Sequence, residues 1–137
     1  MKINLKRLND HFNLEASNEE GNSILIDGSP EIGGHGKGMR PMQLLLAAVG
    51  SCSAIDVILI LKKQKQIIES FEVEVEGERK EIEEYSLFRD IVLHFKIKGK
   101  VDISKAERAV KLSIEKYCSV SKTLEPTAKI TYKVTVN

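Results

Sequence analysis

Tryptophan is absent from the sequence, and only two cysteines and three prolines occur among its 137 residues. Two cysteines are too few for the disulfide framework of a small secreted protein. The pair also lacks the Cys/His spacing of a zinc site, so we expect no metal and no other cofactor. Aromatic residues make up only 5% of the chain, which leaves few side chains for stacking on single-stranded nucleic acid.

An excess of charge of either sign is also missing, since the formal net charge is +1. We therefore expect neither nucleic acid nor an anionic membrane as a partner. The first ten residues, "MKINLKRLND", contain no apolar signal core. These observations predict a cytoplasmic protein, in which a disulfide is more often transient and catalytic than structural. The length predicts a single domain over residues 1–137.

The longest apolar run, residues 44–61, is about as long as a membrane span, which needs roughly 17–25 residues. It contains Gly50 and the ionisable Asp56, and a carboxylate is costly in lipid. Pro41 suits the first turn of a helix, so we predict a helix over about 42–66. Because it is apolar on nearly every side, we expect it to be buried in protein, against a partner chain.

Strand patterns surround this helix. In "ESFEVEVEGERKE" the apolar Phe71, Val73 and Val75 alternate with glutamates, as in a half-buried strand. "YSLFRDIVLHFKIKGK" predicts its hairpin partner, with Arg89 in the inward phase together with Leu87, Ile91, Leu93, Phe95 and Ile97. Short strands are expected in the first forty residues and at 128–136, which predicts an α+β fold with mostly antiparallel sheets.

The two cysteines occupy different settings. Cys52 lies among alanines and Gly50 in the predicted helix, where a free cysteine is often buried and inert. Cys118 follows a second predicted helix, which is capped by Asp102 or Ser104, and precedes a short helical stretch, "SVSKTLE". A thiol at a helix N-terminus has a lowered pKa, so we expect Cys118 to favour the thiolate.

A glycine-rich loop, "GSPEIGGHGKGMRP", holds five glycines and two prolines over residues 28–41. It lacks the spacing of a P-loop or dinucleotide site. It also contains His35, near Lys37 and Arg40. The other histidines, His11 and His94, are expected at the surface. His35 is therefore the one histidine that we consider for a site.

Two motifs resemble those of the OsmC/Ohr family, the osmotically inducible and organic hydroperoxide resistance proteins. "GMRPMQLLLAAVGSCSAIDV" looks like the family's first cysteine helix, and "KYCSVSKTLE" is similar to its second cysteine motif. The glycine-rich loop, the hairpin between helices and the closing strand follow the family's order. The resemblance covers nearly the whole chain, and its details look most like the YhfA-like branch.

The resemblance implies an OsmC-like fold in an intertwined homodimer, with the long central helix buried between sheets of both chains. It also implies a thiol peroxidase that reduces organic hydroperoxides. Cys52 would be the peroxidatic thiolate, Cys118 the resolving thiol, and a dithiol the reductant. The family's site adds a glutamate and an arginine, but Met42 stands at the glutamate position. Arg40, Gln43 and His35 are therefore weaker candidates for binding substrate or supporting the thiolate.

Two alternatives use the same fold. In one, a cavity between subunits binds a small apolar or acidic ligand, and the cysteines serve packing or ligand contact. In the other, the cysteines handle persulfides or other sulfur metabolites. The sequence leaves both alternatives open.

Overall fold

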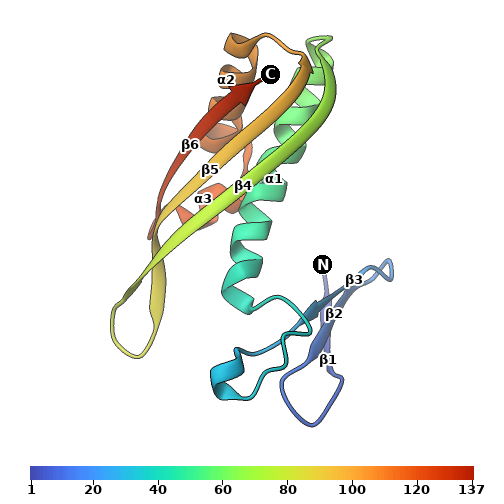
Figure 1. The fold of residues 1–137 in the computed structure, drawn as a ribbon, viewed down its shortest axis with the longest axis vertical. Helices are drawn as coiled ribbons and strands as arrows, with labels where there is room; N and C mark the ends of the chain where they lie inside the picture. Colours follow the sequence, from blue (N-terminus) through green and yellow to red (C-terminus); the bar gives the residue numbers. More distant parts are fainter. The chain divides into compact units, whose positions relative to one another are not determined.

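The computed structural model describes residues 1–137 and divides into two compact units, residues 1–45 and 46–137 (Figure 1). Each unit contains one three-stranded sheet, and three of the four strand pairs are antiparallel, so the prediction of an α+β fold with mostly antiparallel sheets is confirmed. The single-domain prediction stays a prediction. In chain order the elements are β1 (Ile3–Arg7), β2 (Leu14–Asn18), β3 (Ser23–Ile26), the 3₁₀ turn Pro30–Ile32, α1 (Pro41–Lys63), β4 (Ile67–Glu81), β5 (Ser86–Lys100), α2 (Ile103–Leu112), the π-helical turn Ser113–Tyr117, α3 (Ser119–Leu124) and β6 (Lys129–Val136).

The first unit is built on the meander β1-β2-β3, in which both strand pairs are antiparallel. Ala16 and Ile26 are buried in it. The apolar side chains of Ile3, Leu5 and Ile24 are more than half exposed and border a cavity of about 440 Å³. The unit therefore presents an apolar sheet surface that it does not cover itself.

The second unit holds the larger core. Strand β5 pairs antiparallel with β4, as predicted, and parallel with β6. Helices α1 and α2 lie on one face of this sheet (Figure 1). A side chain at Gly50 of α1 would come within 2.8 Å of Val75 on β4, so the helix packs closely on the strand. Four β5 side chains facing the helices are completely buried: Ile91, Leu93, Phe95 and Ile97.

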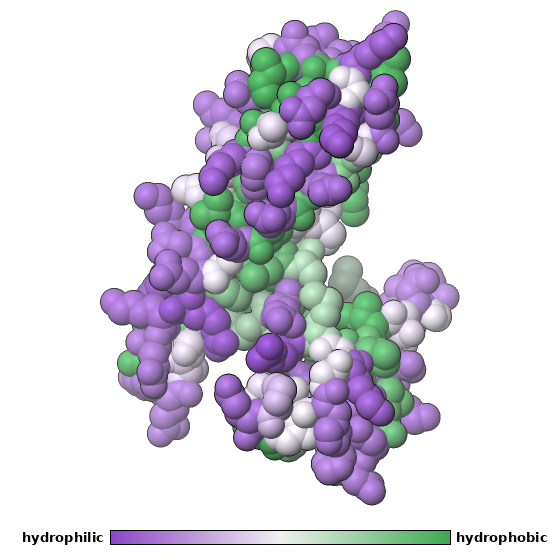
Figure 2. Space-filling view, viewed as in Figure 1, coloured by the Kyte–Doolittle hydropathy of each residue, from purple (hydrophilic) through white to green (hydrophobic).

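Helix α1 begins at Pro41, one residue before the predicted start, and ends at Lys63, three residues before the predicted end. Its last turn carries Lys62 and Lys63, and cations stabilise the negative end of a helix dipole. By length and composition alone α1 could cross a membrane. Only 28% of its most apolar stretch of 18 residues is buried within the chain. Figure 2 shows hydrophobic side chains exposed where α1 runs. Part of the helix therefore lacks the cover that its composition predicts.

The inward placement of Arg89 was a wrong prediction. The β4–β5 register moves from Glu78↔Asp90 to Arg79↔Phe88, so Arg89 is the extra residue of a β-bulge. The bulge reverses the alternation, and Phe88 is buried in place of Leu87. Arg89 is exposed and donates a hydrogen bond to the carbonyl of Thr127 at 3.3 Å.

Replacing Gly99 by alanine is expected to destabilise the protein by about 3 kcal/mol. Gly99 has a φ of +133°, and a Cβ there would overlap the carbonyl oxygen of Ile67. Gly21 is the matched control, because its φ is +87° and a Cβ there meets nothing within 4 Å. Gly21→Ala should cost only about 1 kcal/mol in urea unfolding. Equal losses for the two variants would contradict the packing at Gly99.

Candidate functional site: a buried thiol pair

The two cysteines, far apart in the sequence, meet in the second unit. Cys52 lies in the middle of α1 and is half-buried, whereas Cys118 directly precedes α3 and is fully buried. The Cys52 thiol lies close enough to Cys118 to raise the pKa of the Cys118 thiol, and both are free, without a disulfide. The arrangement can therefore support chemistry that needs a pair of sulfur atoms.

A π-helical turn, Ser113–Tyr117, sets the position of Cys118. The N–H of Cys118 donates to the carbonyl of Ser113 at 2.7 Å, one residue further back than in an α-helix. Such turns are rare and often occur at functional sites. Cys118 then caps α3, and its Sγ accepts a hydrogen bond from the N–H of Ser121 at 3.3 Å. The sequence predicted a plain helix up to Tyr117 and missed this turn.

The expected low pKa of Cys118 was a wrong prediction. Burial is the main effect, and it raises the pKa of the Cys118 thiol to about 11. The N–H of Ser121 opposes this shift, whereas the Cys52 thiol and the charge of Asp56 add to it. Helix α3 has only six residues, so its dipole is too short to offset the desolvation. Cys118 is therefore held as a neutral thiol.

A buried polar network lies between the two cysteine-bearing segments. The Ser113 hydroxyl donates to the carboxylate of Asp56 at 2.9 Å, and its oxygen lies 3.0 Å from the Ser53 hydroxyl. Sequence reasoning did not identify Ser113 as the partner of Asp56. The spacing of Asp56 four residues after Cys52 was the available signal, because it places both on one face of α1.

The three weaker candidates belong to the first unit. Gln43 accepts a hydrogen bond from the N–H of Arg40 at 2.9 Å, so its amide caps the helix that carries it. Arg40 and His35 are exposed. The His35 ring packs edge-on against His11, with 4.5 Å between ring centroids. Roles for these residues in the reaction stay predictions.

Asp27 organises the glycine-rich loop, which sequence reasoning did not foresee. Its carboxylate is buried and accepts the N–H groups of Gly28, His35 and Lys37 at 2.8, 3.2 and 3.0 Å. The Lys37 hydrogen bond contributes most to holding the pKa of Asp27 below its ordinary value. The other two bonds act in the same direction, against the effect of burial. A single carboxylate therefore fixes the loop around His35.

Asp27→Asn is expected to loosen this loop, because an amide accepts these hydrogen bonds less strongly than a carboxylate. Hydrogen exchange at the His35 and Lys37 amides should become about tenfold faster. In the wild type the stabilisation is present above pH 3.8, the ordinary pKa, and is lost as the pH falls through the lowered value. Asp10→Asn, at an exposed position, is the control. Unchanged protection in Asp27→Asn would contradict the role of Asp27.

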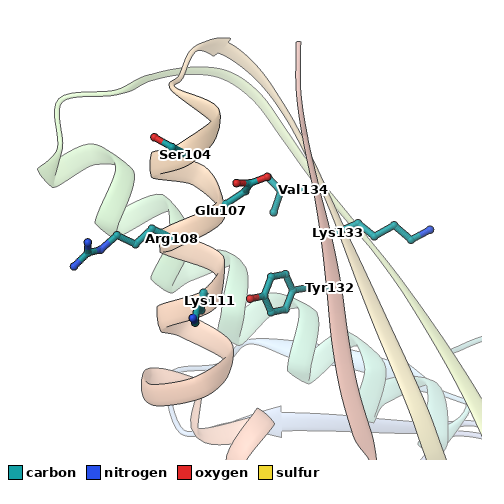
Figure 3. A pocket seen from close by; sticks show the side chains of 7 residues that line it. All are labelled: Ser104, Glu107, Arg108, Lys111, Tyr132, Lys133 and Val134. Atoms are coloured by element: carbon teal, nitrogen blue, oxygen red, sulfur yellow. The ribbon is translucent and has the colours of Figure 1, made fainter.

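A cavity of about 480 Å³ lies between α2 and β6 and shares no residue with the thiol pair. In Figure 3 Tyr132 points toward α2, whereas Lys133 extends away from it. Burial, aided by Glu115 and Glu107, raises the pKa of Tyr132. Nowhere in the chain do three or more His, Cys, Asp or Glu side chains gather in a way that could hold a metal ion. The thiol pair is therefore the group with the most distinctive chemistry.

Comparison with known proteins identifies the family. The pattern of the family described as OsmC-like protein matches residues 34–133, which include both cysteines. The chain belongs to the OsmC family. The resemblance seen in the two cysteine motifs is thus confirmed, and so is the OsmC-like fold.

Relatives of this OsmC-like protein support the assignment. Protein YhfA of Escherichia coli (strain K12) is 44% identical over 118 residues, which cover 85% of this chain and 84% of YhfA. A hypothetical protein from Aquifex aeolicus VF5 has a structure with a TM-score of 0.80 at 33% identity, covering 99% of this chain and 96% of that one.

One structural neighbour has a name that refers to hydroperoxides. It is an organic hydroperoxide resistance protein OsmC from Legionella pneumophila, also described as a predicted redox protein and regulator of sulfide bond formation. Its TM-score is 0.74 at 21% identity, and the match covers 99% of this chain and 98% of that one. At this identity the likeness concerns the fold alone.

Proposed function

We propose that this OsmC-like protein reduces organic hydroperoxides with the thiol pair Cys52 and Cys118. The observation that carries the proposal is the proximity of the two free thiols, one half-buried and one fully buried. Membership of a family that includes hydroperoxide resistance proteins supports it. The half-buried Cys52 is the thiol that a substrate can approach.

The roles of the two cysteines follow from the protonation of Cys118 and the accessibility of Cys52. Cys118, with a pKa of about 11, stays protonated at neutral pH. Cys52 is half-buried and is therefore the thiol that a peroxide can reach. In the proposed reaction Cys52 is therefore the nucleophile and Cys118 the resolving thiol.

The proposed reaction proceeds in three steps. The Cys52 thiolate attacks the peroxide oxygen, the O–O bond breaks, and the alkoxide leaves as an alcohol after taking a proton from water. Cys52 is then a sulfenic acid, which condenses with the Cys118 thiol to a disulfide and releases water. A dithiol of the cytoplasm, where we place the protein, reduces the disulfide through exchange and restores both thiols.

The proposal includes a homodimer built around α1. Ile55 and Leu59 on this helix are 67% and 51% exposed in the single chain. A second copy that covers this apolar face would remove it from water, which is favourable at roughly 25 cal/mol per Å². The same cover would surround the half-buried Cys52 with apolar groups, which suit an aryl or alkyl hydroperoxide better than hydrogen peroxide.

Steady-state consumption of cumene hydroperoxide tests the proposed function. The protein with dithiothreitol should consume the peroxide catalytically, and it should consume hydrogen peroxide at least about tenfold more slowly. Omitting the dithiol should stop the reaction after one equivalent per chain. Consumption no faster than that of dithiothreitol alone would reject the proposal.

A further inference from the structure

Asp56 and Ser113 connect the two cysteine-bearing segments. Asp56 lies one turn after Cys52 on α1, and its carboxylate accepts the Ser113 hydroxyl at 2.9 Å. The carbonyl of the same Ser113 accepts the N–H of Cys118 at 2.7 Å. A continuous path of two hydrogen bonds therefore runs from the helix of Cys52 to the backbone of Cys118.

The surroundings make this connection specific. Ser113 is fully buried, and its hydroxyl also contacts the buried hydroxyl of Ser53. Since a hydroxyl donates only one proton and Ser113 gives it to Asp56, Ser53 donates to Ser113. The Ser113 hydroxyl therefore fixes the position of the Asp56 carboxylate. Cys52 and Asp56, both from α1, are the ionisable groups that act on Cys118, and the π-turn and α3 contribute neutral groups around it.

We propose that Asp56 and Ser113 are positioning residues that hold Cys118 beside Cys52, ready to form the disulfide once Cys52 has been oxidised. The charge of Asp56 adds to the burial that keeps the Cys118 thiol protonated. This inference rests on the proposed function. A protonated thiol is a poor nucleophile, so an organic hydroperoxide reacts at Cys52 first. Cys118 Sγ then attacks Cys52 Sγ of the sulfenic acid: the S–S bond forms, the S–O bond breaks, and hydroxide leaves with the Cys118 proton as water.

The charge effect can be measured without any peroxide. In the Cys52→Ser background Cys118 is the one remaining cysteine, so the ¹³Cβ chemical shift of labelled cysteine reports its ionisation alone. Asp56→Asn keeps an oxygen that accepts the Ser113 hydroxyl but removes the charge, so the Cys118 titration midpoint should fall. At pH 9 the thiolate fraction should rise about threefold. A midpoint that does not fall would overturn the charge role, whether or not the protein reduces peroxides.

The positioning effect is measured as the rate of disulfide closure. Ser113→Ala removes the hydroxyl that joins Asp56 to the π-turn, so closure after one equivalent of cumene hydroperoxide should slow about tenfold. The sulfenic acid should then accumulate and be trapped by a dimedone probe. Thr123→Ala is the control, because it removes an exposed hydroxyl of α3 that bonds Ser119. Its closure should match that of the wild type.

Diamide, which oxidises dithiols without a peroxide, separates this inference from the proposed function. If diamide closes the disulfide more slowly in Ser113→Ala than in the wild type, the positioning role holds even for a protein that does not consume peroxide. Equal closure rates with both oxidants, in a variant whose circular dichroism matches that of the wild type, would overturn it. Asp56→Ala, which removes the acceptor of the Ser113 hydroxyl, serves as the second variant if Ser113→Ala does not fold.

Discussion

Replacing Cys52 by serine is expected to abolish peroxide consumption, because the nucleophile of the first step is lost. Cys118→Ser should instead allow one turnover and then stop with Cys52 as a sulfenic acid, since no thiol remains to form the disulfide. Without a dithiol, the wild type should release one equivalent of alcohol per chain, Cys118→Ser also one, and Cys52→Ser none. Chromatography of the alcohol and intact-protein mass measure these quantities.

The contrast between the two variants is what tests the assignment of roles. Both variants should keep the secondary structure of the wild type, because serine differs from cysteine by one atom. Peroxide consumption at the wild-type rate in both single variants would mean that the thiols do not perform the reaction. A sulfenic acid found on Cys118 in place of Cys52 would reverse the assigned roles.

Ile55→Asp is expected to convert the protein from a dimer to a monomer. Ile55 is 67% exposed on α1, next to the exposed Leu59, and an unpaired carboxylate inside an apolar interface costs several kcal/mol. Light scattering at micromolar concentration should give twice the chain mass of 15.3 kDa for the wild type and the chain mass for the variant. Ser70→Asp, at an exposed position of β4, adds the same charge and should stay dimeric.

A wild-type chain that is monomeric at this concentration would contradict the dimer proposal. A dimeric Ile55→Asp variant would place the interface elsewhere. Activity adds a second reading, because Cys52 loses its proposed apolar surroundings in the monomer. The rate with cumene hydroperoxide should then fall more than the rate with hydrogen peroxide.

Regular periodicity accounts for what the sequence predicted well. The alternation of Phe71, Val73 and Val75 with glutamates identified β4, and the unbroken apolar run after Pro41 identified α1. Asp102, one of the two predicted caps, is the residue that caps α2, since its carboxylate accepts the N–H groups of Ser104 and Lys105. These features depend on local chemistry, which a sequence displays directly.

Irregularities of one residue explain what the sequence did not reveal. The bulge at Arg89 and the π-turn from Ser113 each shift the following residues by one position. Neither carries a glycine or proline signal. Both depend on tertiary contacts, such as the hydrogen bonds of Ser113 to α1. The pKa of Cys118 was missed for a similar reason, because its main cause is burial rather than the adjacent helix end.

The most direct test of the central claim is to count free thiols before and after one equivalent of cumene hydroperoxide. We predict that both thiols disappear together, that the chain loses about two mass units, and that dithiothreitol restores both. Cys52→Ser under the same treatment should keep its single thiol. Thiols of the wild type that persist for hours would contradict the account, and the OsmC-like fold would then hold these cysteines without peroxide chemistry.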